Sequence, residues 1–285
     1  MQNKIIIIFV IFFNLIIFNV YSNDQITFDV SEIEILDGGN KIIGKNRGSI
    51  NTNDGVTIEA DKFEFDKIKN ILKAQGNIKV NDKLNNYDFN AQKLSYFKDK
   101  EKIKIEGKAE ALISSNYRFI TQDINILRNE MIINSDIGAT IFDTINQTRY
   151  EIGKFSYSLE EEILKGEKIF INTKYKEPFS DKFFFKSAIF NLKNQSYIAQ
   201  DINIDFKKDI FGNKANDPRF KGLSSSRKGG VTTINKGVFT TCKKNNNCPP
   251  WSIQADKITY DENKRQILYN NALVKVYDIP VLYFP

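Results

Sequence analysis

Few side chains in this sequence could carry out acid–base, nucleophilic or metal chemistry. The chain of 285 residues contains no histidine and 2 cysteines, Cys242 and Cys248. Histidine is the commonest general base and metal ligand, and two thiolates alone leave a zinc ion short of ligands. Carboxylates are plentiful, but Asp61 and Asp256 occupy equivalent positions of a repeat, which indicates polar residues at strand corners.

Motifs that position such chemistry are also missing. The sequence has no G-x-G-x-x-G after a strand pattern, no G-x-S-x-G, no H-E-x-x-H and no phosphate-binding loop. We therefore expect a protein that is not an enzyme and that uses no metal and no cofactor.

The N-terminal segment has the pattern of a secretory signal. Met1–Lys4 is a basic start, a largely apolar run follows over Ile5–Phe18, and Val20–Ser22 provides cleavage positions. The pattern predicts a signal peptide over residues 1–22 and a mature chain from Asn23. An uncleaved membrane anchor is the alternative, because the run reaches roughly the lower length limit of a spanning helix. Either segment would export the rest of the chain.

Charge and cysteine usage fit an exported protein. The formal net charge of +6 is spread as single lysines between apolar residues, which is typical of a solvated strand face; a mildly basic surface that attracts an anionic ligand or membrane is the alternative. Nucleic acid is not an expected partner, because arginines are not clustered. In an exported chain, disulfides persist, so a local bridge between Cys242 and Cys248 is the simplest prediction.

The longer pattern in the chain is a repeat. The segments Val56–Val80 and Tyr87–Ala111 share an apolar-x-Ala-x-x-apolar-x-aromatic core, whose alanines Ala60 and Ala91 lie 31 residues apart. A fixed period of this length predicts one supersecondary unit per copy. Weaker copies keep the phase over Tyr117–Ile141, Tyr150–Ile171, Phe183–Phe206 and Trp251–Val276.

The alternation of apolar residues within each copy indicates strands. Between Ala60 and Phe63 the alternation slips by one residue, and the slip recurs after Ala91 and Ala255. Such a slip needs a bulge or a corner, so each repeat should be a strand with a corner, a polar turn and a return strand. Stacked kinked hairpins predict an all-β fold, a jelly roll or folded-over sheet with an apolar interior.

Ten alternating residues are expected to face this interior and to line a groove for lipid. They are Ile58, Leu72, Ile78, Phe89, Ile105, Phe119, Ile133, Ile152, Ile169 and Ile204. Lys73, Lys104 and Asn134 should face outward instead. The strand region Val56–Val80 should form the exposed edge of the sheet, because no earlier copy of the repeat covers it.

Three stretches near the C-terminus and one insert carry a family resemblance. They are Gly237–Cys242, Cys248–Ile253 and Val276–Pro285, with the insert Asp209–Asn213 followed by Asn216–Arg219. Together with the repeat, they resemble the OstA-like domain of periplasmic lipopolysaccharide-transport proteins, and most closely the junction between groove domain and barrel in the LptD (OstA) family of outer-membrane lipopolysaccharide-assembly proteins. The resemblance covers about residues 26–285.

The resemblance implies a fold, a domain plan and a function. It implies a signal peptide (1–22), an OstA-like folded-over β-jelly roll (23–206), an insert loop with the cysteine pair (207–250), and a last repeat with the start of a junction (251–285) to an outer-membrane barrel. The implied function is to bind lipopolysaccharide in the periplasm and pass it to the outer membrane. The implied partners are an OstA-like bridge protein that pairs by an edge strand, the barrel, and the barrel's lipoprotein plug. Cysteines of the family's groove domain can also bond to barrel cysteines.

Two other readings compete with this one. A stand-alone periplasmic bridge component would use the same groove without a barrel, although the Cys248–Trp251 and Ile279–Pro285 segments argue against it. A structural β-solenoid or adhesin would instead have a filled interior and no lipid.

Overall fold

The computed structural model describes residues 27–51, 55–82, 87–113, 117–208, 214–244, 250–261, 263–264 and 266–285. Within these ranges the chain is all-β, as the alternation of apolar residues predicts, and its strands form one 19-stranded sheet. The two helical segments are single 3-10 turns, η1 (Asp37–Gly39) and η2 (Lys98–Lys100). No helix within the described ranges has the length and hydropathy needed to cross a bilayer.

The strands follow one another along the chain. They are β1 (Thr27–Leu36), β2 (Lys41–Asn51), β3 (Val56–Ala60), β4 (Lys62–Asp66), β5 (Ile71–Asp82), β6 (Tyr87–Phe97), β7 (Lys102–Ile113), β8 (Tyr117–Leu127), β9 (Ile132–Ser135), β10 (Ala139–Asp143), β11 (Thr148–Ser158), β12 (Ile163–Asn172), β13 (Lys182–Asn191), β14 (Ser196–Asp205), β15 (Arg219–Lys228), β16 (Val231–Thr240), β17 (Trp251–Asp261), β18 (Gln266–Val276) and β19 (Ile279–Phe284).

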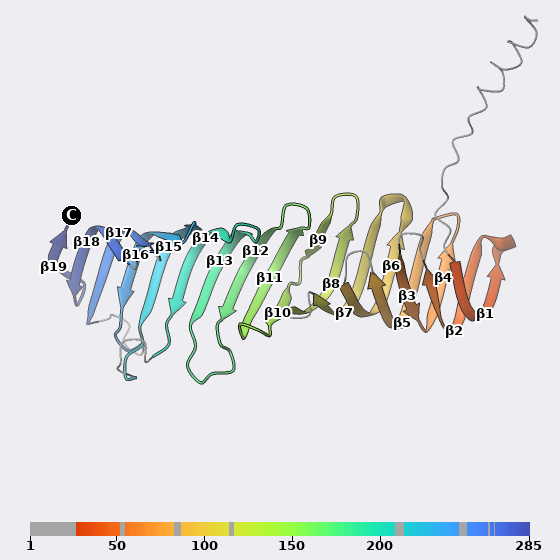
Figure 1. Cartoon of the computed structure of the whole chain (residues 1–285), viewed down its shortest axis with the longest axis horizontal. Coiled ribbons are helices and arrows are strands. Elements are labelled where there is room, and N and C mark those ends of the chain that lie inside the picture. Colours follow the sequence, from red (N-terminus) through yellow and green to blue (C-terminus); the bar gives the residue numbers. More distant parts are fainter. Residues whose placement is uncertain are drawn as a thin grey trace, which may run out of the picture.

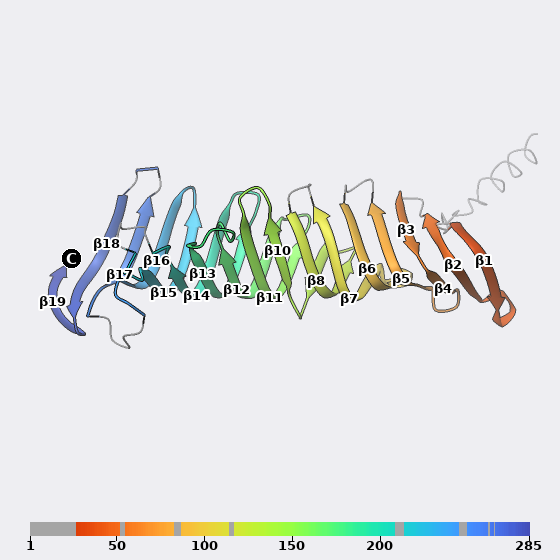
Figure 2. The same ribbon diagram turned by 90° about the horizontal axis from the view of Figure 1, so that it is seen from below.

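The sheet is an antiparallel meander. Each strand pairs with its neighbours in the sequence. The short strands β3 and β4 are two halves of one bent strand, because both pair with β2 and with β5. In the same way β9 and β10 both pair with β8 and with β11. The strands therefore stack along the long axis of the molecule, with β1 and β19 at opposite ends (Figures 1 and 2). Because sequential hairpins make every pairing local, the repeat in the sequence becomes a repeat in space.

Strands along the whole sheet bend at mid-length. Many corners hold a residue with positive φ, and cross-strand pairing skips a residue there, as between Gln75 and Ile78 of β5. Glycine, and less readily Asn and Asp, adopt this left-handed conformation. The corner residues with positive φ are Asn46, Arg47, Gly76, Asn77, Gly107, Asp123, Gly138, Lys168, Asp201, Lys236 and Asn271.

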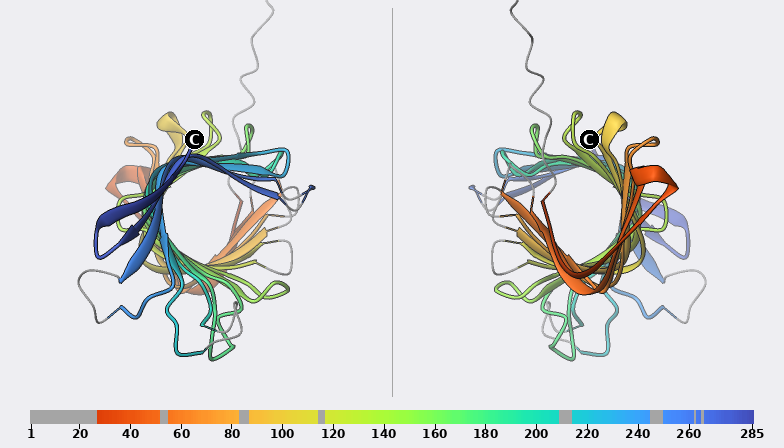
Figure 3. Two further views of the ribbon diagram at one scale, coloured as in Figure 1. Left: turned by 90° about the vertical axis from the view of Figure 1, so that its left-hand side faces the viewer. Right: turned by 90° about the vertical axis from the view of Figure 1, so that its right-hand side faces the viewer.

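The slips seen in the sequence coincide with these corners. Ala60 ends β3 and Phe63 lies in β4, yet both side chains are fully buried on the same interior. The return strands bend as well, as the skipped residues of β5 show, whereas the sequence indicated a corner in only one strand of each hairpin. Seen along the long axis, the bent sheet curves around a central line, and the first and last strands open toward different sides (Figure 3).

Two expectations about the ends of the sheet are wrong. The region Val56–Val80 is not an edge, because β2 pairs with both β3 and β4 and is itself covered by β1. The stretch 207–250 is not only a loop, because β15 and β16 pair with each other and with β14 and β17. Corners at Asn46–Arg47, and the small or polar residues Ser224–Ser226, hide the two-residue alternation in these strands.

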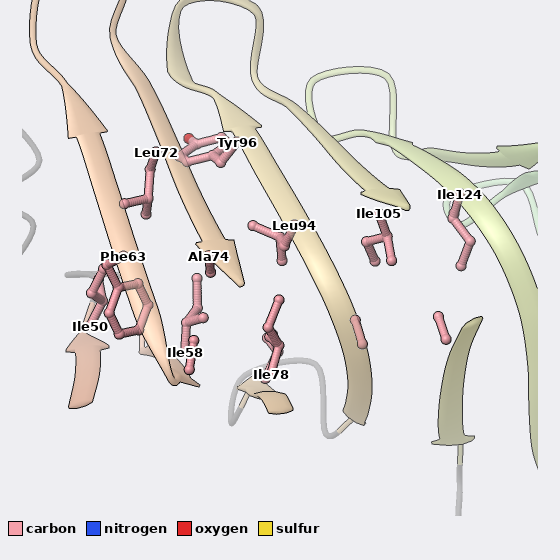
Figure 4. Close-up of a cluster of buried hydrophobic side chains, with 14 residues drawn as sticks. Ile50, Ile58, Phe63, Leu72, Ala74, Ile78, Leu94, Tyr96, Ile105 and Ile124 are labelled. Atoms are coloured by element: carbon pink, nitrogen blue, oxygen red, sulfur yellow. The ribbon is translucent and has the colours of Figure 1, made fainter. Parts of the chain in front are cut away.

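Three clusters of buried apolar side chains fill the inside of the bend. The first draws on β2 to β8, the second on β10 to β14 and the third on β15, β17 and β18. In the first cluster, side chains such as Phe63, Leu94 and Ile105 point from neighbouring strands into one shared interior (Figure 4).

Candidate functional site

The interior face of the sheet carries four rows of side chains that run along the molecule. Residues paired across antiparallel strands lie on the same face, so the register of successive strands can be followed from one end to the other. Rows 1 and 2 lie on the half of each strand next to the turns that contain Asn70 and Lys98. Rows 3 and 4 lie on the other side of the corners. Rows 2 and 3 flank the corner, and we call rows 1 and 4 the rim rows.

Row 4 is apolar throughout. It consists of Ile50, Ile58, Val80, Phe89, Ala111, Phe119, Ile141, Tyr150, Ile171, Phe183, Ile204, Phe220, Phe239, Ile253, Val274 and Leu282.

Row 1 is apolar or aromatic over most of its length. It consists of Ile35, Ile42, Phe65, Leu72, Tyr96, Ile103, Ile126, Ile133, Tyr157, Leu164, Phe190, Tyr197, Arg227, Thr232, Tyr260 and Ile267.

The two rows beside the corner contain more small side chains (Gly, Ala, Ser and Thr) than the rim rows do. Row 2 consists of Ile33, Gly44, Phe63, Ala74, Leu94, Ile105, Ile124, Ser135, Phe155, Gly166, Ala188, Ala199, Ser225, Ile234, Ile258 and Tyr269. Row 3 consists of Val30, Gly48, Ala60, Ile78, Ala91, Ala109, Thr121, Ala139, Ile152, Ile169, Phe185, Ile202, Gly222, Gly237, Ala255, Ala272 and Phe284.

Between β7 and β14 burial decreases from the corner to the rims, whereas the rim residues Ile50 and Leu72 at the N-terminal end are at most 1% exposed. Ala60 and Leu94, beside the corner, are at most 2% exposed, whereas rim residues such as Phe119, Ile133 and Tyr157 are only half-buried. The corner rows therefore form the packed core. Between β7 and β14 the rim rows keep part of their apolar surface exposed.

Aromatic pairs join the two sides of the bend near the corner. Phe119 of row 4 meets Phe155 of row 2 edge-on, with ring centroids 5.8 Å apart. Phe185 of row 3 meets Phe190 and Tyr197 of row 1 at 6.4 and 6.1 Å. These contacts hold the two halves of the strands together at their base, because offset and edge-on aromatic pairs add to the stabilisation from buried area.

All ten residues expected to face the interior lie on these four rows. Six of them, Ile58, Leu72, Ile78, Ile105, Ile152 and Ile169, are buried and act as core. The other four, Phe89, Phe119, Ile133 and Ile204, are half-buried on the rim rows, where a ligand could reach them. Their contact with lipid stays a prediction.

The three residues expected to face outward share one outward row. Lys73 is paired across the strands with Glu64 on one side and Ser95 on the other. Ser95 is paired in turn with Lys104, and the same row then runs through Asn125 to Asn134. Lys73 also approaches Glu64 within 3.9 Å. This row is a solvated strand face, as the spread of single lysines in the sequence indicated.

Sequence reasoning missed most of the rim aromatics in the middle of the molecule. Tyr150 and Phe183 on row 4, and Tyr157 and Phe190 on row 1, are all half-buried on the interior face. Burial raises the pKa of the Tyr150 and Tyr157 hydroxyls, so both rings stay neutral. These residues could have been found in the sequence by taking every second residue of a strand as inward-facing and shifting the alternation by one residue at the corner.

The recurring carboxylates serve the corners. Asp61 accepts hydrogen bonds from Arg47 Nη1 at 3.1 Å and Asn77 Nδ2 at 2.7 Å. Asp256 accepts from Lys236 Nζ at 2.5 Å and Asn271 Nδ2 at 3.1 Å, and the hydrogen bond from Lys236 is the main reason that the pKa of Asp256 is lowered. Each carboxylate joins three neighbouring strands on the outside of the bend.

The cysteine region is partly described. Cys242 is half-buried, and its backbone N–H donates to Thr240 Oγ1 at 3.2 Å. Cys248 lies outside the described residues, so the predicted local bridge stays a prediction. Over the described ranges, no group of three or more His, Cys, Asp or Glu side chains could hold a metal ion.

The sequence matches no protein-family model, and no curated protein matches it.

Proposed function

We propose that the space between the rim rows is an apolar groove that holds the acyl chains of lipopolysaccharide, and that the protein passes this lipid across the periplasm toward the outer membrane. The observation that carries the proposal is row 4, which continues from Ile50 to Leu282 without a charged side chain. A row of this length offers one continuous apolar track across the strands from β2 to β19. The resemblance to OstA-like domains supplies the identity of the lipid.

The half-burial of the rim rows along the middle of the molecule favours a ligand over a filled solenoid. A purely structural solenoid would bury its inward side chains on both sides of the corner. Here Phe89, Phe119 and Ile204 are half-buried although they face inward. Apolar surface arranged in this way is typical of a binding site rather than of a finished core.

The energetics suit a lipid that must be held and still move. Burial of hydrocarbon stabilises by roughly 0.8 kcal/mol per CH₂, so an acyl chain of about twelve carbons gains on the order of 10 kcal/mol before ordering costs. Row 4 offers this gain without directional bonds that would have to break at each step. A chain could therefore slide from one strand position to the next.

Location and partners belong to the same proposal. The proposed signal segment, residues 1–22, lies outside the described residues, and periplasmic location at the outer membrane rests on its sequence and on the family resemblance. The proposed partners are a periplasmic OstA-like bridge protein that pairs with an edge strand, and the barrel with its lipoprotein plug. With β2 and β1 covering β3 and β4, the edge available at the N-terminal end is β1.

Site-specific photo-crosslinking in cells tests the groove. Crosslinkers at Phe119, Ile133 and Ile204, the half-buried inward positions, should label lipopolysaccharide. Matched crosslinkers at Lys73, Lys104 and Asn134 on the outward row should not. Equal labelling at both sets would overturn the proposal. So would a purified, periplasmically expressed chain that carries no co-purified lipid by mass spectrometry.

A further inference from the structure

Positive charge is concentrated in the part of the chain that forms the last five strands. Residues 219–285, from the start of β15 onward, contain 11 Lys and Arg and 4 Asp and Glu, a net charge of +7. Residues 1–218 contain 30 Lys and Arg and 31 Asp and Glu, a net charge of −1. Such an asymmetry is typical of a protein whose basic part meets an anionic surface.

One outward row of these strands combines basic and apolar side chains. It is followed by cross-strand pairing from β15 to β19 and consists of Lys221, Val238, Gln254, Leu273 and Tyr283. Its five members, all described, include no carboxylate. Lys275, two residues after Leu273 on β18, faces the same way. The outer face at this end of the sheet therefore presents lysines beside hydrocarbon.

Tyr283 keeps its ring on this outer face. Its hydroxyl donates a hydrogen bond of 2.9 Å to Oδ1 of Asn271, a corner residue of β18, and the side chain is 55% exposed. Strand pairing occurs in the plane of a sheet and leaves both faces open. A further strand beside β19 would therefore not cover the outer side of this ring.

The turn between β18 and β19 adds a second exposed aromatic side chain. Tyr277 is 67% exposed, and its backbone N–H donates to the carbonyl oxygen of Pro250 at 3.0 Å. The turn is thus held against the start of β17. The end of β16 reaches the same place, because Cys242 Sγ lies 3.7 Å from the Trp251 carbonyl oxygen, and the exposed pair Lys243–Lys244 follows directly. These strands lie side by side at the C-terminal end of the molecule (Figures 1 and 2).

We propose that the outer face of β15 to β19, with the adjoining turn at Tyr277, is a docking surface for an anionic phospholipid bilayer. Lysines close to such a bilayer are attracted by its negative surface potential. Tyrosine is favoured at the headgroup level, where the ring meets hydrocarbon and the hydroxyl stays in water. The proposal concerns the outside of the sheet and does not depend on the groove between the rim rows.

Two other roles for this face give different results with lipid. A face that is only solvated has no affinity for vesicles. An acidic protein could pair with the lysines, but it would leave the chain unattached to a bilayer in its absence. Binding to vesicles of defined charge therefore separates the three.

Co-sedimentation of the full chain with phospholipid vesicles tests the docking surface. Vesicles of phosphatidylcholine and phosphatidylglycerol in equal amounts should bind the chain, and binding should weaken in about 0.5 M NaCl because salt screens surface charge. Vesicles of phosphatidylcholine alone should bind at least about tenfold more weakly. Lys221→Gln combined with Lys275→Gln should weaken binding to the anionic vesicles about twentyfold, since each lysine near such a surface contributes about fivefold. Tyr283→Ser should weaken it about fivefold through lost apolar contact.

Matched controls come from the outward face near the N-terminal end. Lys73→Gln combined with Lys79→Gln removes two exposed lysines from the outward face of β5. Leu112→Ser removes an outward apolar side chain of β7 that is 51% exposed. Both control proteins should bind anionic vesicles like the unmodified chain.

Three results would overturn the docking surface: no binding to anionic vesicles, equal binding to both kinds of vesicle, or equal losses in the test and control variants. A chain that only takes lipid into its groove would not distinguish the two kinds of vesicle and would be insensitive to Lys221→Gln with Lys275→Gln. Failure of the docking surface would therefore leave the proposed function standing.

Discussion

The hydroxyl of Tyr96 donates a hydrogen bond of 2.7 Å to Oε1 of Glu101, and this contact ties row 1 to the turn at its rim. Arg128 joins the pair, with Nη1 at 3.2 Å from the Tyr96 hydroxyl and 3.1 Å from Glu101 Oε2. Its guanidinium also lies over the Tyr96 ring, 5.8 Å from the centroid. The three side chains come from β6, the turn after η2, and the residues just after β8. They fix the rim of the proposed groove across neighbouring hairpins.

This relationship predicts a loss of stability at alkaline pH. Burial, followed by the hydrogen bond to Glu101, raises the pKa of Tyr96. A group whose pKa is raised in the folded state adds stability that is complete below its unfolded pKa, about 10 for tyrosine, and is lost as the pH rises through the folded value. The free energy of unfolding should therefore fall above about pH 10.

Urea unfolding of Tyr96→Phe at two pH values checks this. The variant should be less stable by about 1 kcal/mol at pH 7.5, through the lost hydrogen bond, and should lose less stability than the unmodified chain at pH 10.5. Tyr277→Phe is the control, because Tyr277 is 67% exposed in a turn. Parallel losses in the unmodified chain and in Tyr96→Phe would contradict the assignment.

Sequence alone predicted the architecture well and the ends poorly. The slip between Ala60 and Phe63 revealed a corner because large apolar residues stand on both sides of it. In β2 the corner at Asn46–Arg47 lies between Gly44 and Gly48, two inward glycines that carry no apolar signal. Both glycines lie beneath Val30 of β1, and a Cβ on Gly48 would come within 2.5 Å of that side chain. Because Val30 leaves no room for larger side chains at these two positions, β2 lacks the alternation of apolar residues by which a strand is recognised in a sequence.

The sequence predicted which side chains of the candidate site face inward, but not how deeply each of them is buried. Alternation places Ile105 and Phe119 on the same inward face, but it does not tell that Ile105 is 1% exposed while Phe119 remains half-buried. Between β7 and β14 that distinction follows the distance from the corner, which only the register across strands supplies.

We expect alanine substitutions at the corner glycines Gly138 and Gly107 to lower the free energy of unfolding by different amounts. Both have positive φ, +98° and +81°. A Cβ on Gly138 would lie 2.0 Å from the carbonyl oxygen of Ile152, whereas a Cβ on Gly107 would meet nothing within 4 Å. Gly107→Ala should therefore cost about 1 kcal/mol from backbone strain alone. Gly138→Ala should cost about 3 kcal/mol or more, since the backbone of β11 must also move.

Chemical unfolding midpoints of the two glycine variants decide between strain and crowding. Both proteins should keep a strand-type circular dichroism spectrum. Equal shifts for Gly107→Ala and Gly138→Ala would mean that the close approach of Gly138 to Ile152 is relieved without cost.

A local disulfide between Cys242 and Cys248 is the third prediction. Cys242 Sγ lies 3.7 Å from the carbonyl oxygen of Trp251, at the start of β17. A bridge across so short a loop would stabilise by roughly 2 to 3 kcal/mol on the loop-closure model, enough to fix the approach to β17 but not to hold the sheet. Peptide mapping of the full-length gene product without reduction should recover the two cysteines linked. Recovery of Cys242 linked to another cysteine instead would refute the local bridge.

The last prediction is that the partner protein pairs with β1 rather than with the region Val56–Val80. Among the described strands β1 pairs with β2 alone, so one side of its backbone offers unpaired N–H and C=O groups for strand addition. Its inward residues Ile33 and Ile35, at the ends of rows 2 and 1, are 51% and 64% exposed. An added strand from a partner with the same fold would cover both side chains and continue the rows. Ile35→Arg should weaken binding of a purified OstA-like bridge protein at least tenfold, through lost apolar contact and a charge placed in the joined interior. Ile68→Arg, in a turn and 74% exposed, adds the same charge away from the edge and should leave binding unchanged; equal losses in the two variants, measured by surface plasmon resonance, would place the partner elsewhere than on β1.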